Sequence, residues 1–307
     1  MFSVCSQPVE KLSSFIQHLY LGPIVNSGVL KWRLKDTKDF ITFIHDVNTF
    51  ISANNITSPP IICSIDIKNM FPSIFKDLAL PAIKQRLLGH GFSTDESNAV
   101  VSALEIVRDG TRALWRDEVV RQKDGCSLGP SDSCDYADIA LDAFLQVLVP
   151  RLECQLKVDL SFLGFYRDDV FMGLFEEGRI VLDILNILNC ERQELKFTTE
   201  FCPCGEVLGT CSSCPKKIPF LDCMVSLHSL TKESGITVQQ LMTQTYAKPT
   251  DIHKYIHPSS STPNLSVRSP SIIKGVAHIL RLTNTEYEDS LTALHTLKHQ
   301  VMTGRQS

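Results

Sequence analysis

The sequence predicts an α+β fold, in which helices pack on one face of an antiparallel β-sheet. Short runs rich in β-branched and aromatic residues, bounded by turn residues, predict strands. Longer runs with apolar residues three and four positions apart predict helices. These elements follow one another in mixed order, as strand, helices, hairpin, helix, hairpin, helix and strands, which favours an antiparallel sheet.

The bulk composition is that of a folded globular protein. The chain has 307 residues, of which 43% are hydrophobic and 21% charged, enough for one large or two ordinary domains. No apolar run approaches the ~18 residues of a membrane helix, and the N-terminus lacks a basic segment followed by an apolar one. Eleven cysteines, an odd number, argue against a disulfide framework. We therefore expect a soluble intracellular protein with reduced thiols, in the nucleus or the cytoplasm.

Charge is unevenly distributed along the chain. The formal net charge is −4, whereas proteins that bind nucleic acid usually carry a basic excess. From Cys214 onward there are ten Lys or Arg and six Asp or Glu, a balance of +4, which leaves −8 for residues 1–213. An acidic body with a mildly basic tail is compatible with a metal-binding centre beside a weakly basic surface.

The first part of the chain predicts packing helices and one buried strand. The run from Pro59 to Ile67 predicts a central strand that ends at Asp66. Pro81 is expected to open the next helix, and Ser93 starts a capping box for a helix through Val107. Between Val9 and Phe50, apolar residues with helical spacing form two faces: Leu12, Phe15, Ile16 and Leu19, then Phe40, Phe43, Ile44 and Val47.

The second part predicts two hairpins around a long helix. The first hairpin spans residues 113–125, and Pro150 is expected to stop the helix that follows it. The remaining elements are strands over 160–166 and 170–175, a helix over 179–188, and strands over 196–201, 218–228 and 236–247. This order allows the end of the Asp66 strand to lie beside the turn of Asp168 and Asp169.

Three carboxylates at one sheet edge predict a divalent-cation site. Like charges at close range repel unless a cation neutralises them, and Mg²⁺ prefers carboxylate oxygens, water and phosphates. Polymerases use two such ions to activate the attacking oxygen and to stabilise the leaving one. In the alternative, structural interpretation, Asp66 caps the helix after its strand, and Asp168 and Asp169 face water in a hairpin turn.

Five ordered segments resemble motifs A to E of the reverse transcriptase palm. In chain order they are SIDIKNMFPSI (64–74), DGCSLGPSDSCDYADIAL (124–141), GFYRDDVFMGL (164–174), LKFTTEF with the helix before it (195–201) and IPFLD (218–222). Two later segments, 245–264 and 271–284, resemble the region after the palm in Penelope-like retroelements. The resemblance covers roughly residues 9–300. It implies a right-hand polymerase palm, with an antiparallel sheet backed by helices and with partial fingers and thumb helices.

The resemblance also implies a division of the chain. Residues 1–58 would be a helical lead-in on the fingers side, and residues 236–307 a strand after the palm with a partial thumb. The palm itself would span residues 59–235, with a cysteine-rich hairpin insert at 202–214. The family's fingers region, whose basic residues bind the triphosphate, would lie before Met1 and be missing here. We also expect no endonuclease of the kind that the family often carries.

In the resemblance the carboxylates become catalytic metal ligands. Asp66 matches the motif A ligand, Asp168 the motif C ligand, and Asp169 its supporting neighbour. The implied cofactor is a pair of Mg²⁺ ions, for which Mn²⁺ can substitute. Phe71 matches the aromatic gate that excludes a ribose 2′-hydroxyl, although ordinary core packing would also explain it. Tyr166 would flank the primer end, or be a buried strand aromatic.

Motif B and the turn of motif C depart from the family's pattern. Gly129 matches the glycine that lets the backbone approach the nucleotide, and Gln122 lies in the segment that leads into it. The prolines that usually follow this glycine are not in their expected places, and Arg167 occupies the variable position of motif C. These departures concern the positioning of the template, whereas the metal ligands are intact.

A cluster of cysteines predicts a second, structural metal. Cys202, Cys204, Cys211 and Cys214 have the spacing C-x-C-x6-C-x2-C. Four thiolates this close could hold a tetrahedral Zn²⁺ with no open position for water. The alternative is an intracellular loop with free thiols.

Cations after the palm predict a nucleic-acid surface. A basic, aromatic-containing segment could follow the template and primer backbones. A solvated surface with scattered charge is the alternative. The cations are Lys248, Lys254, Arg268, Lys274 and Arg281.

The resulting hypothesis is an RNA-directed DNA polymerase of a retroelement, which adds deoxynucleotides to a primer 3′-hydroxyl on an RNA or DNA template. Its partners would be template, primer and deoxynucleoside triphosphates, without a membrane; the oligomeric state is left open. The alternative is a truncated, inactive palm that acts as a nucleic-acid-binding or structural module, and a zinc-held binding domain is a third. The missing fingers and altered motif B favour the inactive palm, whereas the intact carboxylates favour the enzyme.

Overall fold

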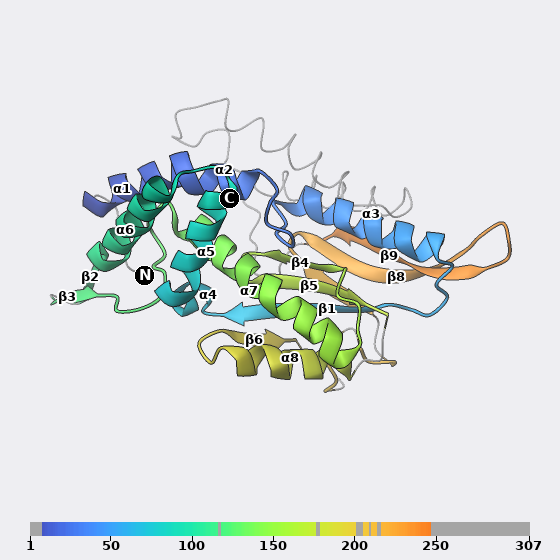
Figure 1. Ribbon diagram of the computed structural model, residues 1–307. Coiled ribbons are helices and arrows are strands. Elements are labelled where there is room, and N and C mark those ends of the chain that lie inside the picture. The colour runs from blue at the N-terminus through green and yellow to red at the C-terminus, as the bar shows by residue number, and fades with distance from the viewer. Residues whose placement is uncertain are drawn as a thin grey trace, which may run out of the picture. The chain divides into compact units, whose positions relative to one another are not determined.

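The computed structural model describes residues 8–115, 118–175, 179–200, 205–208, 210–213 and 216–246. The chain divides into two compact units, residues 1–35 with 65–200 and residues 36–64 with 201–307. Both combine helices with antiparallel strands, so the predicted α+β class is confirmed (Figure 1). No helix in the ranges described is long and apolar enough to cross a membrane.

The first unit is built on a four-stranded sheet with the order β4-β5-β1-β6. The β4–β5 and β1–β6 pairs are antiparallel. Only the second half of β1, from Ile65, belongs to this unit. The strands are β1 (Ile61–Lys68), β4 (Leu163–Tyr166), β5 (Asp169–Leu174) and β6 (Lys196–Thr199).

Helices α7 and α8 lie over one face of this sheet (Figure 1). Phe144 of α7 stacks on Phe197 of β6, with ring centroids 6.0 Å apart. Because Ile65 and Ile67 are also buried, the apolar alternation of β1 faces the helices. The helices of this unit are α1 (Pro8–Ile16), η1 (Gln17–Leu21, a π-helix), α2 (Gly22–Asn26), α4 (Met70–Ser73), α5 (Lys76–Gly89), α6 (Thr94–Gly110), α7 (Ser133–Leu156) and α8 (Ile180–Glu191).

The segment after α2 closes the β4 edge of the sheet. The Leu34 N–H donates to the Phe165 carbonyl at 2.7 Å, and the Phe165 N–H donates to the Trp32 carbonyl at 2.8 Å. Arg33 and Phe165 form an isolated parallel bridge. β4 therefore has a backbone partner on each side.

A hairpin and a helix cap in the first part of the chain were predicted correctly. β2 (Arg112–Trp115) and β3 (Glu118–Arg121) form the predicted antiparallel hairpin. Helix α6 has the predicted capping box, since Ser93 Oγ accepts from the Glu96 N–H and the Glu96 carboxylate accepts from the Ser93 N–H. Both features follow from local sequence signals alone.

The second unit packs α3 (Thr37–Ala53) on a three-stranded sheet with the order β7-β8-β9. The Asn48 side-chain amide makes two hydrogen bonds with the backbone of Leu241, at 2.8 and 2.7 Å, and Phe40 packs against Phe220 with ring centroids 4.6 Å apart. The strands are β7 (Lys217–Phe220), β8 (Cys223–Thr231) and β9 (Thr237–Thr245). The single strand expected over 218–228 is thus two strands, because Leu221, with φ 52°, reverses the chain between them.

Two prolines lie inside helices, and both expectations about them were wrong. Pro81 does not open a helix, because α5 already begins at Lys76, and Pro150 does not end α7, which continues to Leu156. A proline inside a helix removes one backbone hydrogen bond. Buried residues on both sides of each proline, such as Val149 and Leu152 in α7, continue the helix because their burial offsets that loss.

The predicted apolar face of the first helix was also wrong in part. Ile16 is buried, whereas Phe15 and Leu19 are 52% and 47% exposed. Leu19 lies in the π-helix Gln17–Leu21, whose wider turn shifts side chains away from the positions that an α-helical period predicts.

Candidate active site

The sheet brings the strand of Asp66 and the turn of Asp168 together, as predicted. The Ile67 N–H donates to the Asp168 carbonyl at 2.9 Å. Arg167 and Asp168 form the two-residue turn between β4 and β5, and Tyr166 pairs with Asp169 across it. Arg167 has φ 56°, the positive value that tight two-residue hairpins require at a central position. Asp169 is therefore the first residue of β5 and not part of the turn.

Asp66 lies on the sheet face opposite α7 and α8. Successive residues of a strand point to opposite faces, so the buried Ile67 separates two polar residues of the other face, Asp66 and Lys68. In the register with β6, Thr198 lies opposite Asp66 and Lys196 opposite Lys68. Thr198 Oγ1 also donates to the Asp66 carbonyl at 3.3 Å. The end of β1 and the start of β6 thus form one polar face.

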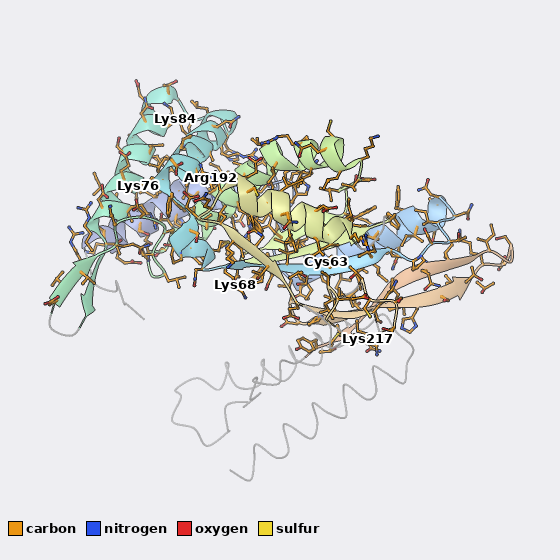
Figure 2. All side chains as sticks on the ribbon, turned by 90° about the horizontal axis from the view of Figure 1, so that it is seen from below. Cys63, Lys68, Lys76, Lys84, Arg192 and Lys217 are labelled. Atoms are coloured by element: carbon orange, nitrogen blue, oxygen red, sulfur yellow. The ribbon has the colours of Figure 1, made fainter. Side chains whose placement is uncertain are left out.

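Lys68 is the cation of this face and was not among the predicted site residues. Its ammonium forms an ion pair with Asp66 Oδ2. Contact with the Asp66 carboxylate and its negative charge raise the pKa of Lys68, and the charges of Glu200 and Asp168 add to this effect. Figure 2 labels Lys68 at the C-terminal end of β1.

Glu200 is a fourth carboxylate of this region that sequence reasoning missed. It follows β6 directly, and positions 196, 198 and 200 fall on one face by strand alternation. Its charge acts on Lys68, as that of Asp66 does. The period-2 spacing in KFTTE was the signal that could have identified it.

Asp66 and Asp168 fit a magnesium site by the chemistry of their donors. Asp66 Oδ2 is shielded from solvent, accepts no hydrogen bond of normal geometry and has Lys68 as its ion-pair partner. Mg²⁺ is usually bound by one or two carboxylates together with water and substrate phosphates. Within the ranges described, no three His, Cys, Asp or Glu side chains converge on one metal position. The backbone contact therefore unites the Asp66 and Asp168 segments, while Asp169 is not gathered with them into a three-ligand cluster.

Phe71 lies in α4, one turn after β1. Asn69, with φ 51°, redirects the chain between the strand and this helix, and the Phe71 side chain is half-buried. The Phe71 carbonyl accepts a hydrogen bond from the Cys126 N–H at 2.7 Å. The position of Phe71 is therefore tied to the segment that leads into α7.

That segment contains two glycines with positive φ. A Cβ on Gly125, whose φ is 80°, would lie 1.9 Å from the Pro72 carbonyl oxygen, so only glycine fits. Gly129, with φ 142°, is exposed. Gln122 Nε2 donates to the Asp124 carbonyl at 2.8 Å and so stabilises the lead-in. The sequence identified Gly129, but the contact makes Gly125 the more constrained of the two.

A buried ion pair holds the start of α7. Arg108 of α6 pairs with Asp132, and the two side chains are 2% and 0% exposed. Ser13 of α1 donates to the other Asp132 oxygen at 2.5 Å, while Arg108 Nη1 donates to Cys126 Sγ at 2.9 Å and to Ser133 Oγ at 3.2 Å. These contacts hold both ends of the loop that contains Gly129, at Cys126 and at Asp132.

A second buried carboxylate ties the Asp168 turn to α7. Asp138 Oδ2 accepts from Arg167 Nη1 at 2.6 Å and from Arg33 Nε at 2.5 Å, and its side chain is only 1% exposed. Arg167 also lies 5.9 Å from the centroid of the Tyr166 ring. Arg167 therefore links the turn between β4 and β5 to helix α7 through its ion pair with Asp138.

The remaining predicted residues fall mostly outside the described ranges. Cys211 is buried, with Sγ 3.1 Å from Ser213 Oγ. Its three partners in the proposed zinc site, Cys202, Cys204 and Cys214, lie outside the described residues. The predicted nucleic-acid surface lies outside them too, with Lys248, Lys254, Arg268, Lys274 and Arg281.

Comparison with known proteins places the fold among polymerases. No protein-family model matches the chain, and no curated protein matches it. The chain is similar to the apo telomerase of Candida tropicalis (12% identity, TM-score 0.54, covering 97% of this chain and 55% of that one). It is also similar to the telomerase of Candida albicans in complex with a TWJ fragment of telomeric RNA (9%, 0.52, 97% and 52%). A third similar structure is the apo C. tropicalis telomerase truncated from its C-terminal domain (13%, 0.51, 70% and 46%).

These similarities bear on the fold. The chain spans about half the length of these solved structures. At 9–13% identity the similarity shows the fold alone, and that fold is an α+β polymerase palm. The fold class predicted from the sequence is confirmed.

Proposed function

We propose that the protein is an RNA-directed DNA polymerase of a retroelement, similar to those of Penelope-like elements. The observation that carries this proposal is the hydrogen bond from the Ile67 N–H to the Asp168 carbonyl, which sets the turn of one carboxylate against the strand of the other. A carboxylate on a strand, Asp66, beside a carboxylate in the adjoining turn, Asp168, would be the protein's part of a two-metal site. The telomerase-like fold supports the same assignment.

Each residue of the site would have a separate role. Asp66 and Asp168 would hold Mg²⁺, with Mn²⁺ as a substitute and with Asp169 in support. Bound metal would lower the pKa of the primer 3′-hydroxyl and neutralise charge on the nucleotide phosphates. The chain's own contribution would be orientation. The ion pair of Arg167 with Asp138 would hold the turn that contains Asp168, and the ion pair of Arg108 with Asp132 would hold the start of α7.

The nucleotide would be selected by the segment around Phe71. Its backbone is fixed by the Cys126 hydrogen bond, so its half-buried ring can act as a rigid wall against a 2′-hydroxyl. Gly129 would let the backbone approach the base, and Tyr166 would flank the primer end.

Primer extension with the purified chain tests the assignment. Asp168→Asn removes a metal-binding charge and is expected to lower incorporation of deoxynucleotides at least 100-fold, roughly the effect of losing a major electrostatic contact in a transition state. The matched control is Asp46→Asn, which removes an exposed carboxylate on α3; this variant should incorporate deoxynucleotides as the wild type does. Equal incorporation by wild type and Asp168→Asn would contradict the proposal.

Substitution of Phe71 tests the choice of sugar. In Phe71→Val the wall is shorter, so ribonucleotides should be incorporated more readily, with deoxynucleotide incorporation less affected. The ratio of kcat/KM for the two sugars is the measurement. An unchanged ratio would leave Phe71 as a packing residue.

We also propose a structural zinc ion in the cysteine cluster. Cys211 supplies the supporting observation, because a buried thiol is shielded as a closed tetrahedral site requires. Elemental analysis of the purified protein should find about one zinc per chain, retained in Cys154→Ser and lost in Cys211→Ser. A zinc-free wild type would show that the cluster consists of free thiols.

A further inference from the structure

Lys68 is placed where a divalent cation would neutralise Asp66. The two residues are separated by the buried Ile67, so their side chains share the exposed face of β1. The Lys68 ammonium contacts Asp66 Oδ2, with the side chains 58% and 33% exposed. No other ion pair of Asp66 is present in the part of the chain that the structure describes.

The charges around Lys68 hold it in this position. Asp66, Glu200 and Asp168 all attract its ammonium. On the other side, Lys196 lies directly opposite in the β1–β6 register, and like charges directly opposite each other on neighbouring strands repel. The Lys196 side chain has no hydrogen bond or ion pair among the described residues. The arrangement therefore favours Lys68 at the carboxylates and not turned towards β6.

We propose that Lys68 is an internal counterion of the metal-binding carboxylates. In the free protein its ammonium neutralises Asp66, and a divalent cation binds only by displacing it. This inference rests on the proposed function in so far as Asp66 is a metal ligand. The displaced ammonium would stay on the face of β1 that it shares with Asp66, where the phosphates of a metal-bound nucleotide would supply an anionic partner in place of Asp66.

Two consequences follow for binding. The site has a lower affinity for a bare divalent cation than its carboxylates alone would give, because the metal competes with a tethered positive charge. A nucleotide relieves that competition, so metal and nucleotide bind with positive coupling.

Binding of Mn²⁺ alone, followed by electron paramagnetic resonance of the free ion, tests the proposal without a catalytic readout. Lys68→Met should bind Mn²⁺ about fivefold more tightly than wild type, the effect of removing a competing ion pair of about 1 kcal/mol. Asp66→Asn should lose this binding in both backgrounds, which identifies the site. Circular dichroism establishes that each variant is folded, and Lys68→Gln provides a second, more polar replacement.

Two lysines serve as matched controls. Lys196→Met removes a neighbouring charge on the same face without removing the contact, and Lys84→Met removes a charge on α5, which Figure 2 shows well away from Lys68. We expect Lys196→Met to tighten Mn²⁺ binding less than about twofold and Lys84→Met to leave it unchanged. Equal Mn²⁺ affinity in wild type, Lys68→Met and Lys68→Gln would overturn the proposal. So would an equal gain in Lys196→Met, or the absence of Asp66-dependent binding from both wild type and Lys68→Met.

The outcome is separable from that of the proposed function. If Lys68→Met binds Mn²⁺ more tightly but the wild type extends no primer, the counterion role of Lys68 is supported and the polymerase function is rejected. Primer extension that depends on Asp168, with Mn²⁺ affinity unchanged in Lys68→Met, would retain the polymerase and reject the counterion.

Discussion

Gly125, in the segment before α7, lies against the backbone of Pro72, which follows β1. Its φ of 80° lies in the left-handed region, and an added Cβ would lie 1.9 Å from the Pro72 carbonyl oxygen. The neighbouring Cys126 N–H bonds the Phe71 carbonyl at 2.7 Å. A side chain at position 125 would therefore push Phe71 out of place.

We expect Gly125→Ala to lower the free energy of unfolding by roughly 2–4 kcal/mol, through left-handed strain and overpacking together. Gly28→Ala is the matched control: Gly28 has φ 86° but nothing within 4 Å of an added Cβ, so it should cost only about 1 kcal/mol. Chemical denaturation of the two variants and the wild type measures the difference. Equal losses would mean that the Pro72 contact adds nothing to the strain of the backbone.

At this scale the sequence predicted the carboxylates but not their neighbours. Asp66 and Asp168 could be predicted because ordered motifs identify them and an antiparallel sheet brings their segments together. Alternation in KFTTE places Glu200 on the face of Lys196 and Thr198, but that Lys68 pairs with Asp66 could not be predicted, because alternation does not show which side chains form an ion pair. The constraint on Gly125 comes from a contact with the distant Pro72, which no local pattern predicts.

Helix α7 connects the turn of Asp168 with the loop that contains Gly129. Its first turn is held by Asp132, and Asp138, in its second turn, receives Arg167 from the turn and Arg33 from the edge segment. Burying charges is costly unless they are paired, so these carboxylates set the position of the helix more than they stabilise the protein.

Breaking the buried pair should cost far more than breaking an exposed one. Arg108→Met leaves the Asp132 carboxylate buried and unpaired, and we expect a loss of roughly 3–5 kcal/mol. The double variant Arg108→Met with Asp132→Asn should recover at least about 1 kcal/mol of the summed losses. The exposed pair of Arg192 and Asp77, with side chains 25% and 65% exposed, is the control and should show a coupling below about 1 kcal/mol.

Double-mutant cycles from denaturation measure both couplings. A coupling for Arg108 and Asp132 no larger than that of the exposed pair would contradict a role in positioning α7. A large coupling for the buried pair and a small coupling for the exposed pair would assign the difference between them to burial.

Element types were easier to predict than element ends and long-range pairs. The capping box of α6 and the β4–β5 hairpin depend on neighbouring residues, so their sequence signals were sufficient. Pro81 and Pro150 were misread because burial of distant surfaces decides whether a helix continues past a proline. Ser13 and Asp132 lie 119 positions apart, and Arg33 and Asp138 lie 105 apart, distances at which a single sequence gives no pairing signal.

The charge of the whole molecule opposes nucleic-acid binding except in its last segment. The net charge of −4 combines −8 over residues 1–213 with +4 from Cys214 onward. A template strand carries one negative charge per nucleotide, so local cations must supply the attraction. The five predicted cations lie in this basic part of the sequence.

Replacing those cations by glutamine should make binding less sensitive to salt. For a duplex primer–template, the slope of log K against log salt concentration should flatten by about 0.9 for each replaced residue that contacts a phosphate. Fluorescence anisotropy over a salt series measures the slope. The replaced residues are Lys248, Lys254, Arg268, Lys274 and Arg281.

Lys84→Gln is the control for each single replacement, since it removes one positive charge on α5 and should leave the slope unaltered. An unchanged slope in the fivefold variant would mean that the cations are a solvated surface. An equal effect of Lys84→Gln would assign the change to net charge alone.

The pairing of residues 32–34 with β4 protects the molecule from strand addition. Without this segment, β4 would present unpaired N–H and C=O groups to solvent, and such an edge is a template for pairing with another chain. A fragment that starts after Leu34 should therefore self-associate, even though it retains every carboxylate of the site. The first thirty-five residues, which contribute none of the proposed metal ligands, keep the β4 edge of the sheet from pairing with a second copy of the chain.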